Sequence, residues 1–203
     1  YARDEYLVEA WSCWQSYSRM YVKALAKPNA LFEQSVFDAL SERPVIVDLG
    51  NGLGFTSLAL KQLVPQATVI ATNVPLSLQY DIANALSNTY DFTMTSDLQS
   101  IEKPVDLVFA SEYFEHFEKP IQHLDEVIDT LKPTFFALAN AFNTQAIGHF
   151  THYAVEDFYN KETDGRTVST LFNKRLREHG YKMLDTKIWN QRPVIWQSQS
   201  TDN

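Results

Sequence analysis

The chain has 203 residues, of which 45% are hydrophobic and 21% charged, a composition typical of a globular protein with one full core. Its 25 Asp and Glu residues outnumber its 17 Lys and Arg residues, and the resulting net charge of −8 disfavours a nucleic-acid substrate held through many phosphate contacts. The single cysteine, Cys13, excludes a disulfide framework and a cysteine zinc cluster, so we expect a cytoplasmic protein. No apolar run reaches the roughly 18 residues of a membrane span, so we expect no membrane partner.

Apolar residues recur at spacings of three and four in six segments, which is typical of amphipathic helices. In chain order, these predicted helices span residues 6–25, 29–40, 55–64, 76–87, 120–131 and 168–179. The first is rich in aromatic residues, a pattern consistent either with a lid over a pocket or with a helix packed on a sheet. Pro120 suits the beginning of the fifth helix, and Gly180 suits the end of the sixth. His123 falls off the apolar stripe of its helix, which indicates exposure to solvent.

Seven short runs rich in β-branched and other apolar residues predict strands. They lie at residues 44–48, 68–73, 91–95, 105–110, 134–141, 181–188 and 192–197. Alternating strands and helices imply crossover connections, and hence a mostly parallel sheet with helices on both faces. No helix separates the last two strands, so we expect them to pair as an antiparallel hairpin.

The predicted fold class is therefore α/β, a three-layer Rossmann-like sandwich with a mostly parallel seven-stranded sheet and an antiparallel C-terminal hairpin. No internal repeat, low-complexity stretch or linker interrupts the chain, so we expect a single domain over residues 1–203. Within it, residues 1–40 would form an N-terminal helical cap and residues 198–203 a polar tail.

A glycine-rich loop joins the first strand to the third helix. Asp48 is followed by Gly50, Gly52 and Gly54, and a helix is expected from Phe55. Glycine permits positive φ and close approach to a ligand, and the next helix points its free N–H groups at the loop. The spacing differs from the Gly-x-Gly-x-x-Gly of dinucleotide-binding folds and lacks the Gly-Lys-Ser/Thr of phosphate-binding loops. A nucleotide-type site and a ligand-free turn both remain open at this point.

The segment 48–54, Asp-Leu-Gly-Asn-Gly-Leu-Gly, resembles the first motif of class I S-adenosylmethionine (SAM)-dependent methyltransferases. The resemblance implies that the loop binds the amino-acid end of SAM and that Asp48 helps to hold its ammonium group. After the second strand the family usually has Asp or Glu to accept the ribose hydroxyls, whereas this sequence has Asn73. Asp97 matches the position that commonly holds the adenine amino group, with a helix cap as the alternative role.

The segment 105–120 resembles the part of many small-molecule methyltransferases that follows the fourth strand. There a Glu-x-x-Glu-His pattern, here Glu112, Glu115 and His116, precedes a helix, and a Leu-Lys-Pro turn follows, here at 131–133. The resemblance spans about residues 44–197 with its motifs in the family's order, and it implies SAM as cofactor. The cofactor-binding residues we expect are Asp48, Gly50, Asn51, Gly52, Gly54, Asn73, Asp97, Leu98, Ser111 and Glu112.

The methyl group of SAM is already activated, so the main task of such a protein is alignment, which can contribute roughly 7–11 kcal/mol. A base is needed only if the acceptor must lose a proton. His116 is the candidate base because imidazole titrates near neutral pH, and Glu115 is the second catalytic candidate. The alternative for His116 is a histidine that only hydrogen-bonds a loop.

A metal site is a further hypothesis. If the segment is helical, Glu112, Glu115 and His116 share one face and can bind a divalent cation together with a downstream histidine, His149 or His152, of which we select His152. The arrangement is similar to the metal site of RNA 3′-end 2′-O-methyltransferases. In the broader family, however, the first Glu only lines the SAM pocket, and that alternative stays open.

The acceptor site is expected, from position alone, around Tyr113, Phe114, His149, His152, Tyr153 and the aromatic residues of the N-terminal helix. Residues 111–114 lack the Asp/Asn-Pro-Pro-aromatic loop of amino-methylating DNA enzymes, and Cys13 is far from this loop in sequence, which disfavours cytosine C5 chemistry. We therefore expect transfer of a methyl group to an O or N atom of a small-molecule acceptor.

Two alternatives remain beside that function. One is a metal-assisted RNA methyltransferase, which the Glu/His set favours and the acidic charge disfavours. The other is an inactive methyltransferase-fold partner subunit, an alternative raised by Asn73. The glycine spacing disfavours a nicotinamide-dependent oxidoreductase. The sequence does not indicate the oligomeric state.

Overall fold

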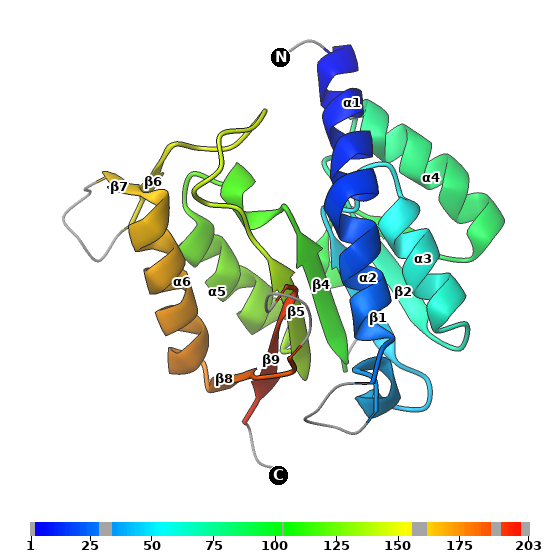
Figure 1. Ribbon diagram of the computed structural model, residues 1–203. Coiled ribbons are helices and arrows are strands. Elements are labelled where there is room, and N and C mark those ends of the chain that lie inside the picture. The colour runs from blue at the N-terminus through cyan, green and yellow to red at the C-terminus, as the bar shows by residue number, and fades with distance from the viewer. Residues whose placement is uncertain (1–2, 29–33, 103, 156–161, 188–191, 200–203) are drawn as a thin grey trace.

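A central sheet lies between layers of helices in the computed structural model, which describes residues 3–28, 34–102, 104–155, 162–187 and 192–199 (Figure 1). The strands are β1 Val45–Leu49, β2 Thr68–Thr72, β3 Thr93–Thr95, β4 Leu107–Ser111, β5 Phe135–Ala139, β6 His152–Ala154, β7 Glu162–Asp164, β8 Tyr181–Leu184 and β9 Val194–Ser198. The α-helices are α1 Arg3–Cys13, α2 Arg19–Leu25, α3 Phe55–Leu63, α4 Leu78–Tyr90, α5 Pro120–Leu131 and α6 Gly165–Glu178. No helix among the described residues is long and apolar enough to cross a membrane.

The main sheet has the strand order β3-β2-β1-β4-β5-β9-β8. The pairs from β3 to β5 are parallel, while β9 pairs antiparallel with both β5 and β8. This confirms the predicted fold class, including the C-terminal hairpin. From β1 the strand order proceeds to β2 and β3 on one side and to β4 and β5 on the other, so the order reverses between β1 and β4. Open α/β sheets bind ligands at the carboxyl ends of the strands at such a switch point.

Alternate residues of each central strand enter two separate cores, as the period of two requires. On β4, Val108 and Ala110 pack with residues of α5 and α6, whereas Leu107 and Phe109 pack with residues of α2 and α3. All four are fully buried, and burial of each larger side chain contributes roughly 1.5–3 kcal/mol. The two cores thus cover both faces of the sheet and leave the carboxyl ends of its strands for the candidate site.

The predicted helix at 29–40 is wrong in its second half. Residues 29–33 lie outside the described residues, and the described part contains only the 3₁₀ turn η2, Phe37–Ala39. Ser35 explains the difference, because its backbone N–H and its hydroxyl both donate to Asp38, 3.0 and 2.7 Å away. Such local side-chain bonds compete with helical backbone bonds.

The N-terminal helix also differs from expectation, because a turn of π-helix, η1 Trp14–Ser18, separates α1 from α2. Turns of this kind occur frequently at functional sites. The α2 end is anchored by three core residues, Tyr21, Val22 and Leu25.

At the other end of the chain, Ser198 belongs to β9 rather than to a polar tail, and residues 200–203 lie outside the described residues. The small hairpin of β6 and β7 was not expected from the sequence.

Candidate functional site

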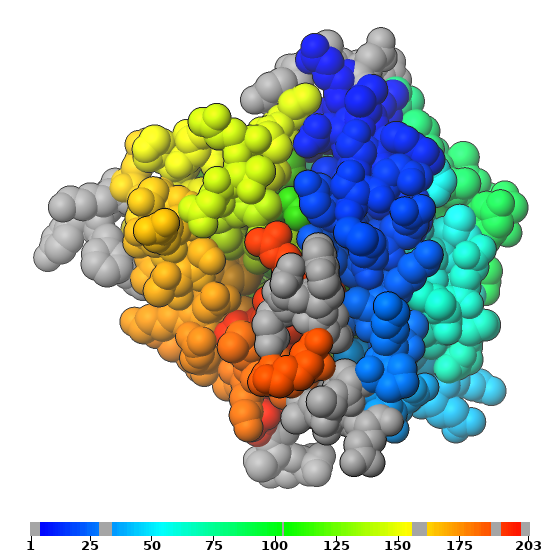
Figure 2. All heavy atoms as spheres, viewed as in Figure 1, coloured from blue at the N-terminus to red at the C-terminus, as the bar shows by residue number. Residues whose placement is uncertain are grey.

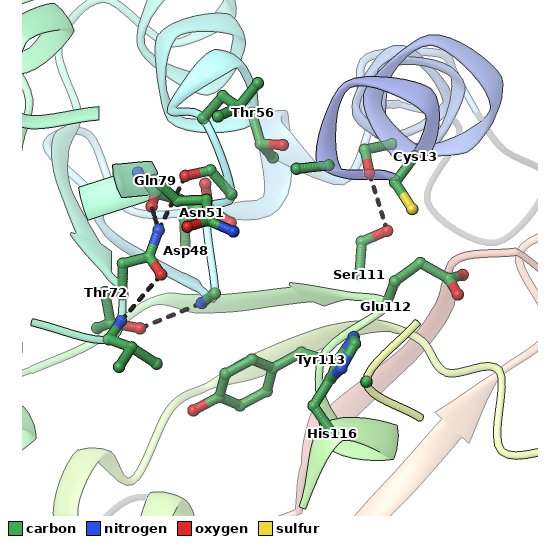
Figure 3. A pocket seen from close by; sticks show the side chains of 18 of the residues that line it. Cys13, Asp48, Asn51, Thr56, Thr72, Gln79, Ser111, Glu112, Tyr113 and His116 are labelled. Carbon is green, nitrogen blue, oxygen red and sulfur yellow. Dashed lines mark hydrogen bonds between the residues drawn. The ribbon is translucent and has the colours of Figure 1, made fainter. Parts of the chain in front are cut away.

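A cavity of about 580 Å³ opens at the carboxyl ends of β1, β2 and β4. Its volume lies within the usual range for small-molecule and cofactor sites, roughly 300–1,000 Å³. The glycine loop, the segment after β4 and the helix formed by α1 and η1 supply most of its walls (Figure 3). In Figure 2 the blue N-terminal helix lies beside the yellow-green segment that follows β5. A Cβ added at Gly148 of that segment would lie 3.4 Å from Cε2 of Tyr6 in the helix.

The glycine loop has the backbone that its sequence predicts, with positive φ at Gly50, Gly52 and Gly54. A Cβ at Gly50 would lie 2.4 Å from Cδ2 of Tyr113, so that only glycine lets the Tyr113 ring pack against the loop. Helix α3 begins directly after Gly54, and no side chain caps its first turn. Free N–H groups at a helix N-terminus attract an anionic group such as a carboxylate.

Asp48 lies beneath the loop at the wall of the cavity and is only 2% exposed. Burial raises the pKa of its carboxyl group to about 7, and a 2.6 Å hydrogen bond from the Ser57 hydroxyl opposes the shift. A cation bound nearby would stabilise the ionised form of this carboxyl group.

Asn73 holds the glycine loop directly. Its amide nitrogen donates to Oδ1 of Asn51 at 3.1 Å and to the carbonyl of Gly52 at 2.8 Å. Its amide oxygen accepts the backbone N–H of Val74 at 2.9 Å. A carboxylate in place of Asn73 would face two acceptors, Oδ1 of Asn51 and the Gly52 carbonyl, and could donate to neither. The amide of Asn73 therefore complements that of Asn51.

Of the other expected cofactor residues, Leu98 and Ser111 line the cavity. Ser111 is hydrogen-bonded through its hydroxyl to Ser18 of η1, 3.1 Å away, and so ties β4 to the N-terminal helix. Asp97 instead caps the 3₁₀ turn η3, Leu98–Ser100, where its Oδ1 accepts the N–H of Gln99 at 2.9 Å. In this structure Asp97 thus makes the contact of a helix cap, which was the alternative to binding the adenine amino group.

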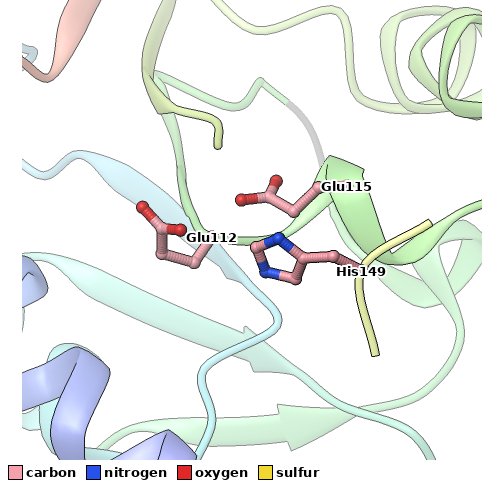
Figure 4. A group of neighbouring side chains, drawn as sticks. All are labelled: Glu112, Glu115 and His149. Carbon is pink, nitrogen blue, oxygen red and sulfur yellow. The ribbon is translucent and has the colours of Figure 1, made fainter. Parts of the chain in front are cut away.

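Glu112, Glu115 and His149 form a cluster at the end of the cavity, with one ligand-type atom of each within 4.8 Å of the others (Figure 4). Glu112 has a φ of 52°, a conformation rare for a side-chain-bearing residue. Glu115 is fully buried in η4, Phe114–His116, and its Oε1 accepts the N–H of Ala141 at 2.9 Å. Among the described residues its Oε2 has no hydrogen-bond partner. Burial raises the pKa of both carboxyl groups.

The histidine in this cluster is His149, whereas His116 and His152 were expected there from the sequence. The Nδ1–H of His149 donates to the carbonyl of Thr144 at 2.9 Å, which leaves the lone pair of Nε2 available. His116 lines the cavity with its ring perpendicular to that of His149, and burial together with His149 lowers its pKa to about 4. His152 lies on β6 with an exposed side chain beside Thr151, outside the cluster.

Of the expected acceptor residues, Tyr113 and His149 line the cavity, whereas Phe114 and Tyr153 are fully buried core residues. His123 was expected in solvent, yet its Nε2 lies 2.8 Å from the Tyr113 hydroxyl and its ring stacks on Phe117. The sequence did hold a signal for this contact. His123 lies in the first turn of α5, and that turn directly follows the segment after β4 that contains Tyr113.

The N-terminal helix contributes lining residues that the sequence did not single out, among them Glu9 and Cys13. Figure 3 shows Cys13 beside Ser111 and Glu112, so its distance in sequence was a poor guide. Burial and the neighbouring carboxylates raise the pKa of its thiol to about 12. Cysteine acts as a nucleophile in its thiolate form, and a raised pKa leaves little thiolate at neutral pH. Covalent catalysis by Cys13 is therefore disfavoured.

Comparison with known proteins finds similarity to methyltransferase sequences. Residues 47–137 match a family model described as a methyltransferase domain. The chain is also 37% identical over 89 residues to the release factor glutamine methyltransferase of Mycolicibacterium smegmatis, covering 41% of this chain and 32% of the relative. The chain thus spans about a third of the length of that curated relative.

Solved structures share the fold at low sequence identity. A Methanococcus maripaludis protein assigned to the SAM-dependent methyltransferases is 16% identical, with a TM-score of 0.61 over 99% of this chain and 94% of that chain. An O-methyltransferase family protein of Burkholderia thailandensis is 14% identical, with a TM-score of 0.60 over 99% of this chain and 60% of that one. The methyltransferase in complex with the Haloferax volcanii Trm112 activator is 19% identical, with a TM-score of 0.59 over 91% and 78%. The fold is therefore that of SAM-dependent methyltransferases.

Proposed function

We propose that this chain binds SAM in the cavity at the carboxyl ends of β1 and β4 and transfers its methyl group to an O or N atom of a small-molecule acceptor. The observation that carries the proposal is the glycine loop, whose three positive-φ glycines and uncapped α3 N-terminus form one wall of a cofactor-sized cavity. The match of residues 47–137 to a methyltransferase domain supports the same function.

The residues present fit SAM at the amino-acid end. The uncapped N-terminus of α3 suits a carboxylate, and the buried Asp48 suits an ammonium group. At the ribose end, Asn73 lines the cavity but offers an amide rather than a carboxylate. When bound, SAM would supply an activated methyl group, and the protein would align the acceptor with it.

Two glycine substitutions test the proposal. Gly52→Ala places a methyl group on the loop at a φ of 55°, where the nearest atom is Cβ of Ala10 at 3.9 Å. Gly180→Ala is the matched control, because Gly180 has a φ of 80°, has no atom within 4 Å of the added methyl, and lies at the end of α6 away from the cavity. Both should lose about 1–2 kcal/mol of stability from left-handed strain.

Only Gly52→Ala should weaken the binding of S-adenosylhomocysteine, by about tenfold or more in calorimetric titration. Lack of measurable binding by the unmodified chain would overturn the proposal and leave the partner-subunit alternative. Equal affinities of the two variants would mean that the loop is not the cofactor site.

A second candidate is a metal-assisted transfer, which the unpartnered Oε2 of the buried Glu115 favours. Glu112, Glu115 and His149 would hold a divalent cation through two carboxylates and one imidazole, a set that suits Mn²⁺ or Zn²⁺. Titration of the chelated protein with Mn²⁺ and Zn²⁺ tests this candidate. Stoichiometric binding that Glu115→Gln abolishes and His152→Ala preserves would support it, and absence of binding would exclude it.

A further inference from the structure

The cavity has a marked charge asymmetry. Glu9, Asp48 and Glu112 are among the described residues that line it, and Glu115 lies directly behind Glu112, whereas no lysine or arginine is among those lining residues. Burial raises the pKa of Glu112, and Arg192, which lines a separate, smaller pocket, opposes this shift electrostatically. An acceptor with a carboxylate or phosphate would therefore meet acidic side chains and no lysine or arginine among the described residues that line the cavity.

The same end of the cavity also favours a ligand that donates hydrogen bonds. Oε2 of the fully buried Glu115 has no donor among the described residues, and the carboxyl group of Glu112 lies within 4.8 Å of Glu115. A buried carboxyl oxygen without a hydrogen-bond partner is destabilising, so a ligand that donates to it gains affinity. An alcohol brings one donor, whereas an ammonium group brings up to three and a positive charge.

The N-terminal helix also places an aromatic side chain near this acidic end. Tyr6 lines the cavity with its ring centroid 6.5 Å from that of His116, whereas Trp14 and Tyr113 line the cavity beside the glycine loop. Aromatic faces attract alkylammonium groups, and combined with carboxylates they form the usual surroundings of such cations in proteins.

We infer that the acceptor is an amine whose nitrogen is held by Glu112 and Glu115 against the aromatic wall of the N-terminal helix, an inference that rests on the proposed methyl transfer. The nitrogen gives its proton to a carboxyl oxygen that holds it, and its lone pair then forms the C–N bond. The C–S bond of the cofactor breaks, and its electron pair goes to sulfur, so that atoms and charges balance without another reactant.

Matched ligands test the inference on the full chain saturated with S-adenosylhomocysteine. The probes are an amine, an alcohol and a carboxylate on the same propyl, benzyl and indolylethyl groups, with binding measured by calorimetry. We expect at least one amine to bind about tenfold more tightly than its alcohol and the corresponding carboxylate not to bind. Glu112→Gln and Glu115→Gln should each remove this preference.

Glu118→Gln is the matched control, because Glu118 is exposed in the same segment and outside the lining residues. Equal binding of amines and carboxylates, failure of every amine to bind, or an unchanged preference in both cavity variants would overturn the inference. An amine preference that disappears on chelation would assign the carboxylates to a metal instead. Failure of S-adenosylhomocysteine itself to bind would refute the proposed function, which separates the two failures.

Discussion

Asn73 shows how one residue can depart from a family pattern and still serve the site. Its amide N–H groups donate to Asn51 and to the Gly52 carbonyl, so the side chain secures the loop from which the cavity is built. A carboxylate has no proton to donate and would repel both oxygen atoms. Asn51 and Asn73 therefore form a pair that has to change together.

The first prediction follows from that pair. Asn73→Asp should lower the free energy of unfolding by about 1–3 kcal/mol, because two acceptors in partly buried hydrogen bonds lose their donor and face a negative charge. Urea denaturation at neutral pH measures the change. Asn73→Ala, which removes the donor without adding charge, should cost less. A variant Asn73→Asp as stable as the unmodified chain would show that these bonds do not hold the loop.

The second prediction concerns pH and Asp48. The folded-state pKa of about 7 lies above the ordinary value of 3.8, so the folded chain binds a proton that the unfolded chain has lost between these values. The contribution of Asp48 to stability is therefore fully present below about pH 4 and is lost as the pH rises through about 7. Between these two values the free energy of unfolding falls by about 1.4 kcal/mol per pH unit.

Asp48→Asn keeps an oxygen that accepts from Ser57 but does not titrate. The difference in unfolding free energy, variant minus unmodified chain, should therefore increase from pH 5 to pH 8 in urea titrations without ligand. A difference that stays constant across this range would contradict the burial of an ionisable group at this position. Saturating S-adenosylhomocysteine should reduce the increase, because its ammonium group stabilises the carboxylate.

At the scale of elements, the sequence predicted best where one strong pattern acts alone. Helix α5 spans Pro120 to Leu131 as its apolar stripe and first proline indicate, and the strand before the glycine loop ends one residue after the expected Asp48. The helix expected through residue 40 failed because Ser35 and Asp38 bond to each other, which apolar spacing does not register. Strands β6 and β7 have three residues each, too few for an alternation to be recognised.

The candidate site was predictable to the level of segments but not of side chains. The loop at 48–54 and the segment after β4 do line the cavity, since strand order alone brings their ends together. The choice between His149 and His152 depends on a turn held by the bond from His149 to Thr144, and this bond spans five residues without a periodic signal. Glu9 and Cys13 could not be placed, because the position of the N-terminal helix depends on tertiary packing.

The third prediction tests that helix as a wall of the cavity. Trp14 stacks on Phe55 with ring centroids 5.9 Å apart, and both residues line the cavity beside the glycine loop. Trp14→Ala should weaken S-adenosylhomocysteine binding by about tenfold, mainly through faster dissociation. Val8→Ala, on an exposed part of α1, is the control and should bind normally. Unchanged affinity in both variants would mean that the helix does not take part in binding.

For the whole molecule, the arrangement of two cores on one sheet predicts a single cooperative unit. Leu60 of α3 lies in one core and Leu124 of α5 in the other, and both are fully buried. The central strands contribute alternate residues to both cores, so neither helical layer can leave without exposing the opposite face of the same strands. Such shared strands are what a single domain over residues 1–203 would require.

The fourth prediction is that Leu60→Ala and Leu124→Ala each lower the free energy of unfolding by about 2–5 kcal/mol. In both variants far-UV circular dichroism and tryptophan fluorescence should follow one coincident transition, because loss of either core unfolds the shared strands. Two separated transitions would show that the layers unfold independently, and the single-domain prediction would then be wrong. Since neither leucine lines the cavity, S-adenosylhomocysteine should bind both folded variants with unchanged affinity, which separates loss of stability from loss of the site.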